Sequence, residues 1–165
     1  MQDALVAAAD DLVGDGMRDT GIALTDTLRH YMAITLARYM REQVQVDGLT
    51  IRIVEAMDRR ATVGEMRALA DACLIGCAMF TERLRARGGS LRHYSGMGQT
   101  AYDAARLVEQ AVSFSHMRDV LAAAASRPPE GVRALIDAAR AGSTTARASL
   151  KDDGIIAFPA RRFYS

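Results

Sequence analysis

The stretch TVGEMRALADACLIGCAMFTERLRAR, residues 62–87, decides the fold class of this 165-residue chain. Thr62, followed three residues later by Glu65, is typical of a capping box, the polar motif with which many helices begin. Residues 72–80 carry no charge, so the pattern predicts a helix over 63–87 that is buried on more than one side. Its apolar face comprises Met66, Leu69, Ala70, Cys73, Leu74, Cys77 and Leu84.

The same helical periodicity extends over most of the chain. Apolar residues recur every three or four positions, as on one face of a helix. The first proline is Pro128, so the strongest helix breaker is missing from residues 1–127. Leu49, Ile53 and Met57 are expected on the buried face of the third helix. The expected helices span residues 2–13, 20–44, 49–59, 63–87, 97–125 and 129–141.

Glycine pairs mark the expected helix ends. Gly14–Gly16 is expected to end the first helix, and Gly88–Gly89 to end the helix over 63–87. Gly96–Gly98 is interpreted as a tight turn that lets the next helix start. Residues 113–116 are expected to kink or split that helix.

These elements predict an all-α protein with a single domain. The length fits one domain. We expect a bundle of five to seven helices over residues 1–142, with helix 63–87 at its centre and helices 20–44 and 97–125 against it. Residues 143–165 form the expected C-terminal tail, which we expect to be partly extended.

Composition excludes several classes of protein. The chain has 21 Lys and Arg against 20 Asp and Glu, and 50% of its residues are hydrophobic. A disordered chain is therefore excluded, and the near-zero net charge makes nucleic acid an unfavoured partner. No apolar run approaches the length of about 18 residues that a membrane span needs.

The compartment follows from the N-terminus and the cysteines. The N-terminus is acidic and lacks the basic region of a secretory signal. Cys73 and Cys77 lie four residues apart on an apolar helix, where a disulfide would strain the backbone. We therefore expect reduced thiols and a cytoplasmic location.

The tail carries the expected partner-binding residues. Large apolar side chains together with two arginines are expected to fold back onto the bundle or to dock on another chain. The residues assigned to partner binding are Ile155, Ile156, Phe158, Arg161, Arg162, Phe163 and Tyr164.

A second candidate surface surrounds the Gly96–Gly98 turn. Four arginines lie between residues 83 and 92. They favour one of two interpretations: a contact with an anion or an acidic partner, or a helix end exposed to solvent. The residues assigned to this contact are Arg87, Arg92, His93, Tyr94, Gly96 and Gly98.

Metal, cofactor and catalytic patterns are weak. Cys73 and Cys77 with His93 and His116 match no usual zinc spacing, and no Glu-x-x-His pair suggests a di-iron site. We therefore predict no metal and no cofactor. Neither a carboxylate pair nor a catalytic triad emerges, so an enzyme that uses Asp71, His93 or a cysteine is the third choice of function.

Residues 70–102 carry a resemblance. Their spacing resembles a family of small uncharacterised all-helical bacterial proteins with a Gly-Asp-x-x-Leu segment, then a Phe followed shortly by Glu-Arg, and then Tyr-Tyr-x-x-Met-Gly-x-x-Ala-Tyr. The chain departs from that pattern at Ala70 and His93. The resemblance implies an all-helical fold and brings no activity with it. The matching residues are Asp71, Leu74, Phe80, Glu82, Arg83, Tyr94, Met97, Gly98, Ala101 and Tyr102.

Three functional hypotheses follow. The first is a non-enzymatic adaptor or regulator that binds a protein partner, with its tail as the contact; homodimerisation is compatible with it. The second is a small-molecule or lipid binder with a pocket between helices 20–44 and 63–87. The third is the enzyme. Asp71, a carboxylate on an apolar helix, is expected to pair with an arginine or to cap the Gly96–Gly98 turn, because an unpaired buried charge is costly.

Overall fold

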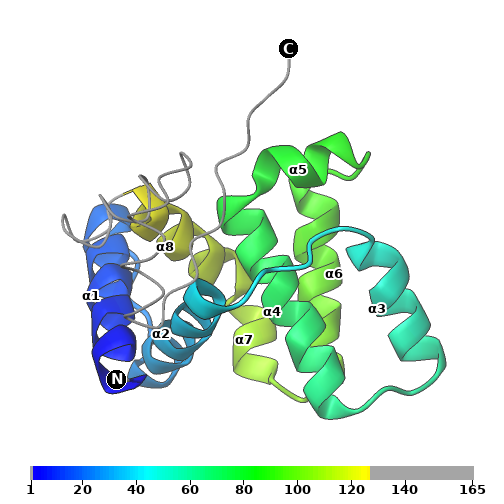
Figure 1. Ribbon diagram of the computed structural model, residues 1–165, viewed down its shortest axis with the longest axis horizontal. Coiled ribbons are helices and arrows are strands. Elements are labelled where there is room, and N and C mark those ends of the chain that lie inside the picture. The colour runs from blue at the N-terminus through cyan, green and yellow to red at the C-terminus, as the bar shows by residue number, and fades with distance from the viewer. Residues whose placement is uncertain (1, 127–165) are drawn as a thin grey trace.

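The computed structural model describes residues 2–126, which form eight helices and no strand (Figure 1). This confirms the all-α prediction for that part of the chain. The expected helix 129–141 and the tail 143–165 lie outside the described residues. In chain order the helices are α1 (Gln2–Thr20), α2 (Asp26–Arg41), α3 (Leu49–Asp58), α4 (Val63–Met79), α5 (Thr81–Ala86), α6 (Leu91–Ala104), α7 (Val108–Val112) and α8 (Phe114–Ser126).

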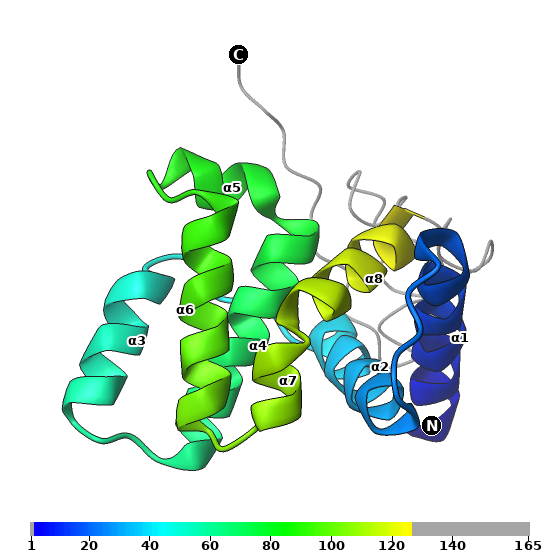
Figure 2. The same cartoon turned by 180° about the vertical axis from the view of Figure 1, so that it is seen from behind.

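Helix α4 is the centre of the bundle. It packs against α6, α8 and α3, while α1 packs against both α2 and α8. Helices α1 and α3 lie at opposite ends of the molecule (Figures 1 and 2). The expected neighbour α2 packs mainly against α1, and it reaches α4 through long tyrosine side chains.

The first helix is longer than the sequence predicted. The prediction that Gly14–Gly16 ends it was wrong, because α1 continues to Thr20. A Cβ atom at Gly16 would lie 2.3 Å from the backbone oxygen of Val120, so this glycine serves close packing of α1 on α8. The left-handed residue after the helix is Gly21, with a φ of 69°.

The predicted helix 63–87 divides at Phe80. Thr62 and Glu65 form the capping box that the sequence predicted. Phe80 leaves the helical conformation at a ψ of 35°, and the short helix α5 follows. Asp47, in the linker before α3, pairs with both Arg83 and Arg87, and these contacts hold α5 against the linker.

The predicted helix 97–125 is three helices. Helix α6 begins at Leu91, with Ser90 as its cap, so the interpretation of Gly96–Gly98 as a turn was wrong. Helix α6 ends where Arg106 adopts a φ of 60° and the Leu107 N–H donates to the Tyr102 carbonyl at 2.9 Å. This pattern is a Schellman-type ending, and the expected break near residue 113 separates α7 from α8.

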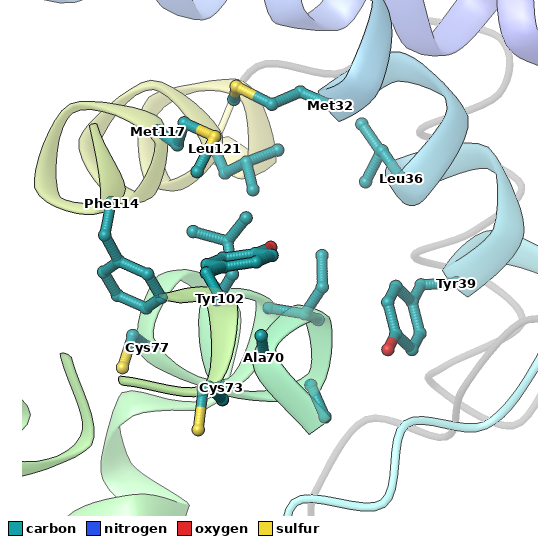
Figure 3. Packing of buried hydrophobic residues seen from close by; sticks show 14 of the residues in the cluster. Met32, Leu36, Tyr39, Ala70, Cys73, Cys77, Tyr102, Phe114, Met117 and Leu121 are labelled. Atoms are coloured by element: carbon teal, nitrogen blue, oxygen red, sulfur yellow. The ribbon is translucent and has the colours of Figure 1, made fainter. Parts of the chain in front are cut away.

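The core is continuous from α1 to α8. Tyr102, Phe114, Met117 and Leu121 are fully buried where α4, α6 and α8 meet (Figure 3). The aromatic rings of Tyr102 and Phe114 lie 6.0 Å apart. Within the described helices, none is long and apolar enough to cross a membrane.

Two glycines of α6 provide a test of this packing. A Cβ atom at Gly98 would lie 2.4 Å from the Phe114 ring and 3.0 Å from the Cys73 Cβ, whereas one at Gly96 would meet open space. We expect Gly98→Ala to lower the free energy of unfolding by about 1–3 kcal/mol because the core must shift. The matched control Gly96→Ala should raise it by about 0.5–1 kcal/mol through helix propensity. Urea unfolding measures both, and equal effects would contradict the close approach of α6 to α8.

Candidate functional site

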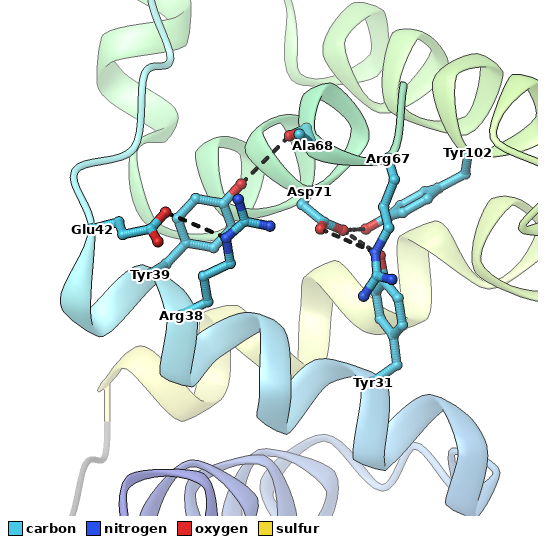
Figure 4. Close-up of polar contacts among 8 residues, drawn as sticks. All are labelled: Tyr31, Arg38, Tyr39, Glu42, Arg67, Ala68, Asp71 and Tyr102. Atoms are coloured by element: carbon cyan, nitrogen blue, oxygen red, sulfur yellow. Dashed lines mark hydrogen bonds and ion pairs between the residues drawn. The ribbon is translucent and has the colours of Figure 1, made fainter. Parts of the chain in front are cut away.

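The most concentrated polar chemistry among the described residues surrounds Asp71 on α4. We call Asp71, Arg67, Tyr31 and Tyr102 the Asp71 cluster (Figure 4). The Tyr31 hydroxyl donates to Asp71 Oδ1 at 2.5 Å, and the Tyr102 hydroxyl donates to the same oxygen at 2.7 Å. One carboxylate oxygen therefore connects helices α2, α4 and α6.

Arg67 closes the solvent side of the Asp71 cluster. Its Nε lies 3.8 Å from Asp71 Oδ2, and its guanidinium carbon lies 4.9 Å from the centre of the Tyr31 ring. The Asp71 side chain is 2% exposed and that of Arg67 is 44% exposed. The arginine therefore balances the buried charge from the edge and covers the aromatic ring with its planar group.

Burial dominates the electrostatics of the Asp71 cluster. Burial raises the pKa of the Asp71 carboxyl above its ordinary value, while the hydrogen bonds from Tyr31 and Tyr102 and the charge of Arg67 act to lower it. Burial and the adjacent carboxylate raise the pKa of Tyr31 and of Tyr102. The two phenols therefore stay protonated at neutral pH and keep donating to Asp71.

This geometry suits a structural role. A catalytic base must face the group from which it takes a proton, but Asp71 Oδ1 faces two hydroxyl donors of its own chain. The alternative expectation, that Asp71 caps a turn at Gly96–Gly98, was wrong because those residues lie inside α6. The arrangement fixes three helices relative to one another.

Both thiols lie in the core. Cys73 and Cys77 are buried and form no disulfide, and burial raises the pKa of Cys73 to about 12 and that of Cys77 to about 11. The Ser95 hydroxyl lies 4.0 Å from the Cys77 sulfur and accepts a hydrogen bond from Arg118 Nη1 at 3.3 Å. A reactive cysteine needs a lowered pKa, so these thiols act as packing groups.

The predicted anion-contact residues do not form one surface. Arg87 pairs with Asp47 at 3.4 Å, and the His93 Nε2 lies 2.9 Å from the Thr50 hydroxyl. Arg92 is exposed. The remaining three residues also belong to α6, but Tyr94 and Gly98 are buried and Gly96 is half-buried.

The outer face of α3 is a surface that sequence reasoning missed. We give this name to Ile51, Val54 and Met57, which are 64%, 46% and 43% exposed, together with the exposed carboxylates of Glu55 and Asp58. The expectation that Met57 is buried with Leu49 and Ile53 was wrong. Ala56 takes that place in the core. A signal was available, because apolar residues occur on more than one side of LTIRIVEAMD.

The predicted partner-binding residues of the tail lie outside the described residues. They are Ile155, Ile156, Phe158, Arg161, Arg162, Phe163 and Tyr164. The assignment of these residues to partner binding stays a prediction.

Substitutions at Asp71 separate the roles of its charge and its oxygen. We expect Asp71→Ala to lower the free energy of unfolding by about 2–4 kcal/mol, because two phenol hydroxyls lose their acceptor. Asp71→Asn keeps a carbonyl oxygen for both donors, so its cost should stay below about 1.5 kcal/mol. Chemical unfolding of both variants measures the difference. Equal losses would show that the negative charge, and not the shared acceptor, is what the fold requires.

Thiol reactivity tests the burial of the cysteines. At pH 8 a pKa near 11 leaves far fewer thiolates than an ordinary cysteine has. We therefore expect the folded protein to react with Ellman's reagent about two orders of magnitude more slowly than the protein unfolded in guanidinium. Comparable rates in the two states would contradict the buried positions of Cys73 and Cys77.

Comparisons with known proteins returned no match to this chain among family models, curated proteins or solved structures.

Proposed function

We propose that this protein is a non-catalytic adaptor or regulator that binds a short apolar segment of a protein partner on the outer face of α3. The observation that carries the proposal is that α3 is apolar on both sides. Leu49, Ile53 and Ala56 pack into the core, while Ile51 and Val54 project on the opposite side. Exposed apolar side chains that lie next to one another are a candidate surface for a protein partner.

Charge defines the partner's chemistry. Glu55 and Asp58 lie four residues after Ile51 and Val54, so they share their side of the helix. Among the described residues, neither carboxylate forms an ion pair. The partner segment should therefore combine apolar side chains with one or more basic side chains.

The interior supports a non-catalytic role. The carboxylate of Asp71 and the hydroxyls of Tyr31 and Tyr102 are used in contacts between helices. The pKa of both thiols is raised, which disfavours nucleophilic chemistry. These buried groups of the described part of the chain thus serve packing and contacts between helices.

Capture of partners by surface variants tests this proposal. The full-length protein is immobilised, proteins are captured from cells that naturally produce it, and the partner identified is then purified. We expect the double variant Ile51→Asp, Val54→Asp to weaken the purified partner's binding at least about tenfold, as loss of central apolar contacts does. Isothermal titration calorimetry gives the two dissociation constants.

A matched control lies on α7. Val112 is 80% exposed, and α7 lies on the other side of α6 from α3 in both views (Figures 1 and 2). The double variant Val108→Asp, Val112→Asp adds the same two carboxylates to exposed valines of α7 and should leave partner binding within about twofold of the natural chain. Equal binding by all three proteins would exclude α3 as the contact surface.

A further inference from the structure

We infer that the outer face of α3 is also the docking site for the chain's own segment GIIAFPARRFYS, residues 154–165, when no partner is bound. This segment lies outside the described residues. The docking itself is independent of the proposed function. Its regulatory meaning, that a partner must displace the segment, rests on the proposed function and deepens it.

The size of the surface favours a short tethered segment. Helix α3 has 10 residues, which corresponds to a length of about 15 Å and an outer face of roughly 150 Å². A stable interface between two independent proteins needs about 800 Å² from each partner. A second copy of the chain, like a separate partner segment, would therefore need contacts beyond α3 to bind stably. A segment of the same chain needs much less area, because the tether supplies an effective concentration in the millimolar range.

The charges of the two surfaces are complementary. Segment 154–165 contains Arg161 and Arg162 and no acidic side chain, while the outer face of α3 presents Glu55 and Asp58. Opposite charges at the rim of an apolar contact fix its register and disfavour wrong partners.

Glu55 and Asp58 form no ion pair with the arginines of the α3 region, although Arg60 is exposed next to the end of α3. Arg52 Nη2 donates to the Gln45 carbonyl at 2.5 Å, and Arg59 pairs with Glu65 at 3.1 Å. The carboxylates of Glu55 and Asp58 are therefore open to a basic side chain of the segment.

The apolar groups also match in kind. Ile51, Val54 and Met57 form a stripe along α3. The segment offers five large apolar side chains within ten residues: Ile155, Ile156, Phe158, Phe163 and Tyr164. Aliphatic side chains covered by aromatic ones lose apolar surface to water, which is the main driving force for such a contact.

The connecting chain is long enough. The 27 residues 127–153 connect α8 to the segment, and α8 ends toward the α1 end of the molecule (Figures 1 and 2). A chain of that length spans at most about 90 Å when extended, and about 65 Å if residues 129–141 form the helix that the sequence predicts. A domain of about 125 residues has a radius of gyration of roughly 14 Å, so the segment can reach α3 at the far end.

Hydrogen exchange of the full-length protein tests the docking. We compare the natural chain with the double variant Ile156→Asp, Phe158→Asp and follow the peptide that covers α3. We expect exchange of the α3 amides to become at least about fivefold faster in the variant, because a covering segment limits local opening. The matched control Ala146→Asp, Ala148→Asp adds two carboxylates at the same spacing outside the segment and should leave α3 unchanged. No change in either variant would overturn the inference.

Charge reversal checks that the segment and α3 touch each other. We expect faster hydrogen exchange within residues 154–165 in each of two double variants. One carries Glu55→Arg with Asp58→Arg, and the other carries Arg161→Glu with Arg162→Glu. The combination of all four substitutions should restore protection, as complementary charges predict. Failure of the combination to restore it would overturn the direct contact.

Dilution separates docking within one molecule from docking between copies. Protection of α3 should stay constant over about a hundredfold range of protein concentration, because a tethered contact does not depend on it. Protection that disappears on dilution would overturn docking within the chain and assign the segment to a second copy. The α3 variants could alter partner capture while the segment variants leave hydrogen exchange of α3 unchanged. That result would support the proposed function and overturn the docking of segment 154–165.

Discussion

The Asp71 cluster fixes the position of α2 relative to α4 and α6, with which α2 otherwise has little direct contact. Helix α2 packs mainly on α1, yet the Tyr31 hydroxyl crosses to Asp71 on α4. Tyr102 brings α6 to the same oxygen. A buried carboxylate must be satisfied or the fold loses several kcal/mol. The requirements of this one side chain therefore restrict how three helices can be placed.

The Asp71 cluster is in direct contact with the apolar core. The Tyr102 ring lies 6.1 Å from that of Tyr31 and 6.0 Å from that of Phe114, so aromatic contacts extend from α2 to α8. Phe114 in turn packs against Gly98, where a side chain would clash. Glycine at that point allows α6 to approach α8 closely. Tyr102 thus takes part both in the hydrogen bonds to Asp71 and in the close packing of the core.

The interior and the surface of the described part of the chain differ in character. The carboxylate, phenols and thiols that could take part in a reaction instead hold helices together. By contrast, α3 lies at one end of the molecule and presents Ile51, Val54 and Met57 to solvent. A stripe of this kind is costly to leave in water. Our proposal is that a segment with apolar and basic side chains covers it, next to the carboxylates of Glu55 and Asp58.

Sequence and tertiary structure contributed different things to the candidate site. Asp71 was recognisable as the odd carboxylate on an apolar helix. Its partners Tyr31 and Tyr102 lie 40 and 31 residues away, and no local pattern joins positions so distant. The apolar outer side of α3 was readable in principle. Which side of α3 stays exposed depends on where α4 and α6 pack against it. The sequence alone does not contain that information, so Met57 was wrongly assigned to the core.

The sequence by itself determined that this chain is helical and where several helices begin, because capping and 3.6-residue periodicity are local properties. Tertiary structure decided where the helices break and which glycines serve packing. Gly16 lies within a helix because α8 passes close to it, and α4 ends at Phe80 where the chain turns into α5. Contacts between distant segments outweigh local propensity, since burying apolar surface contributes more free energy than a glycine costs.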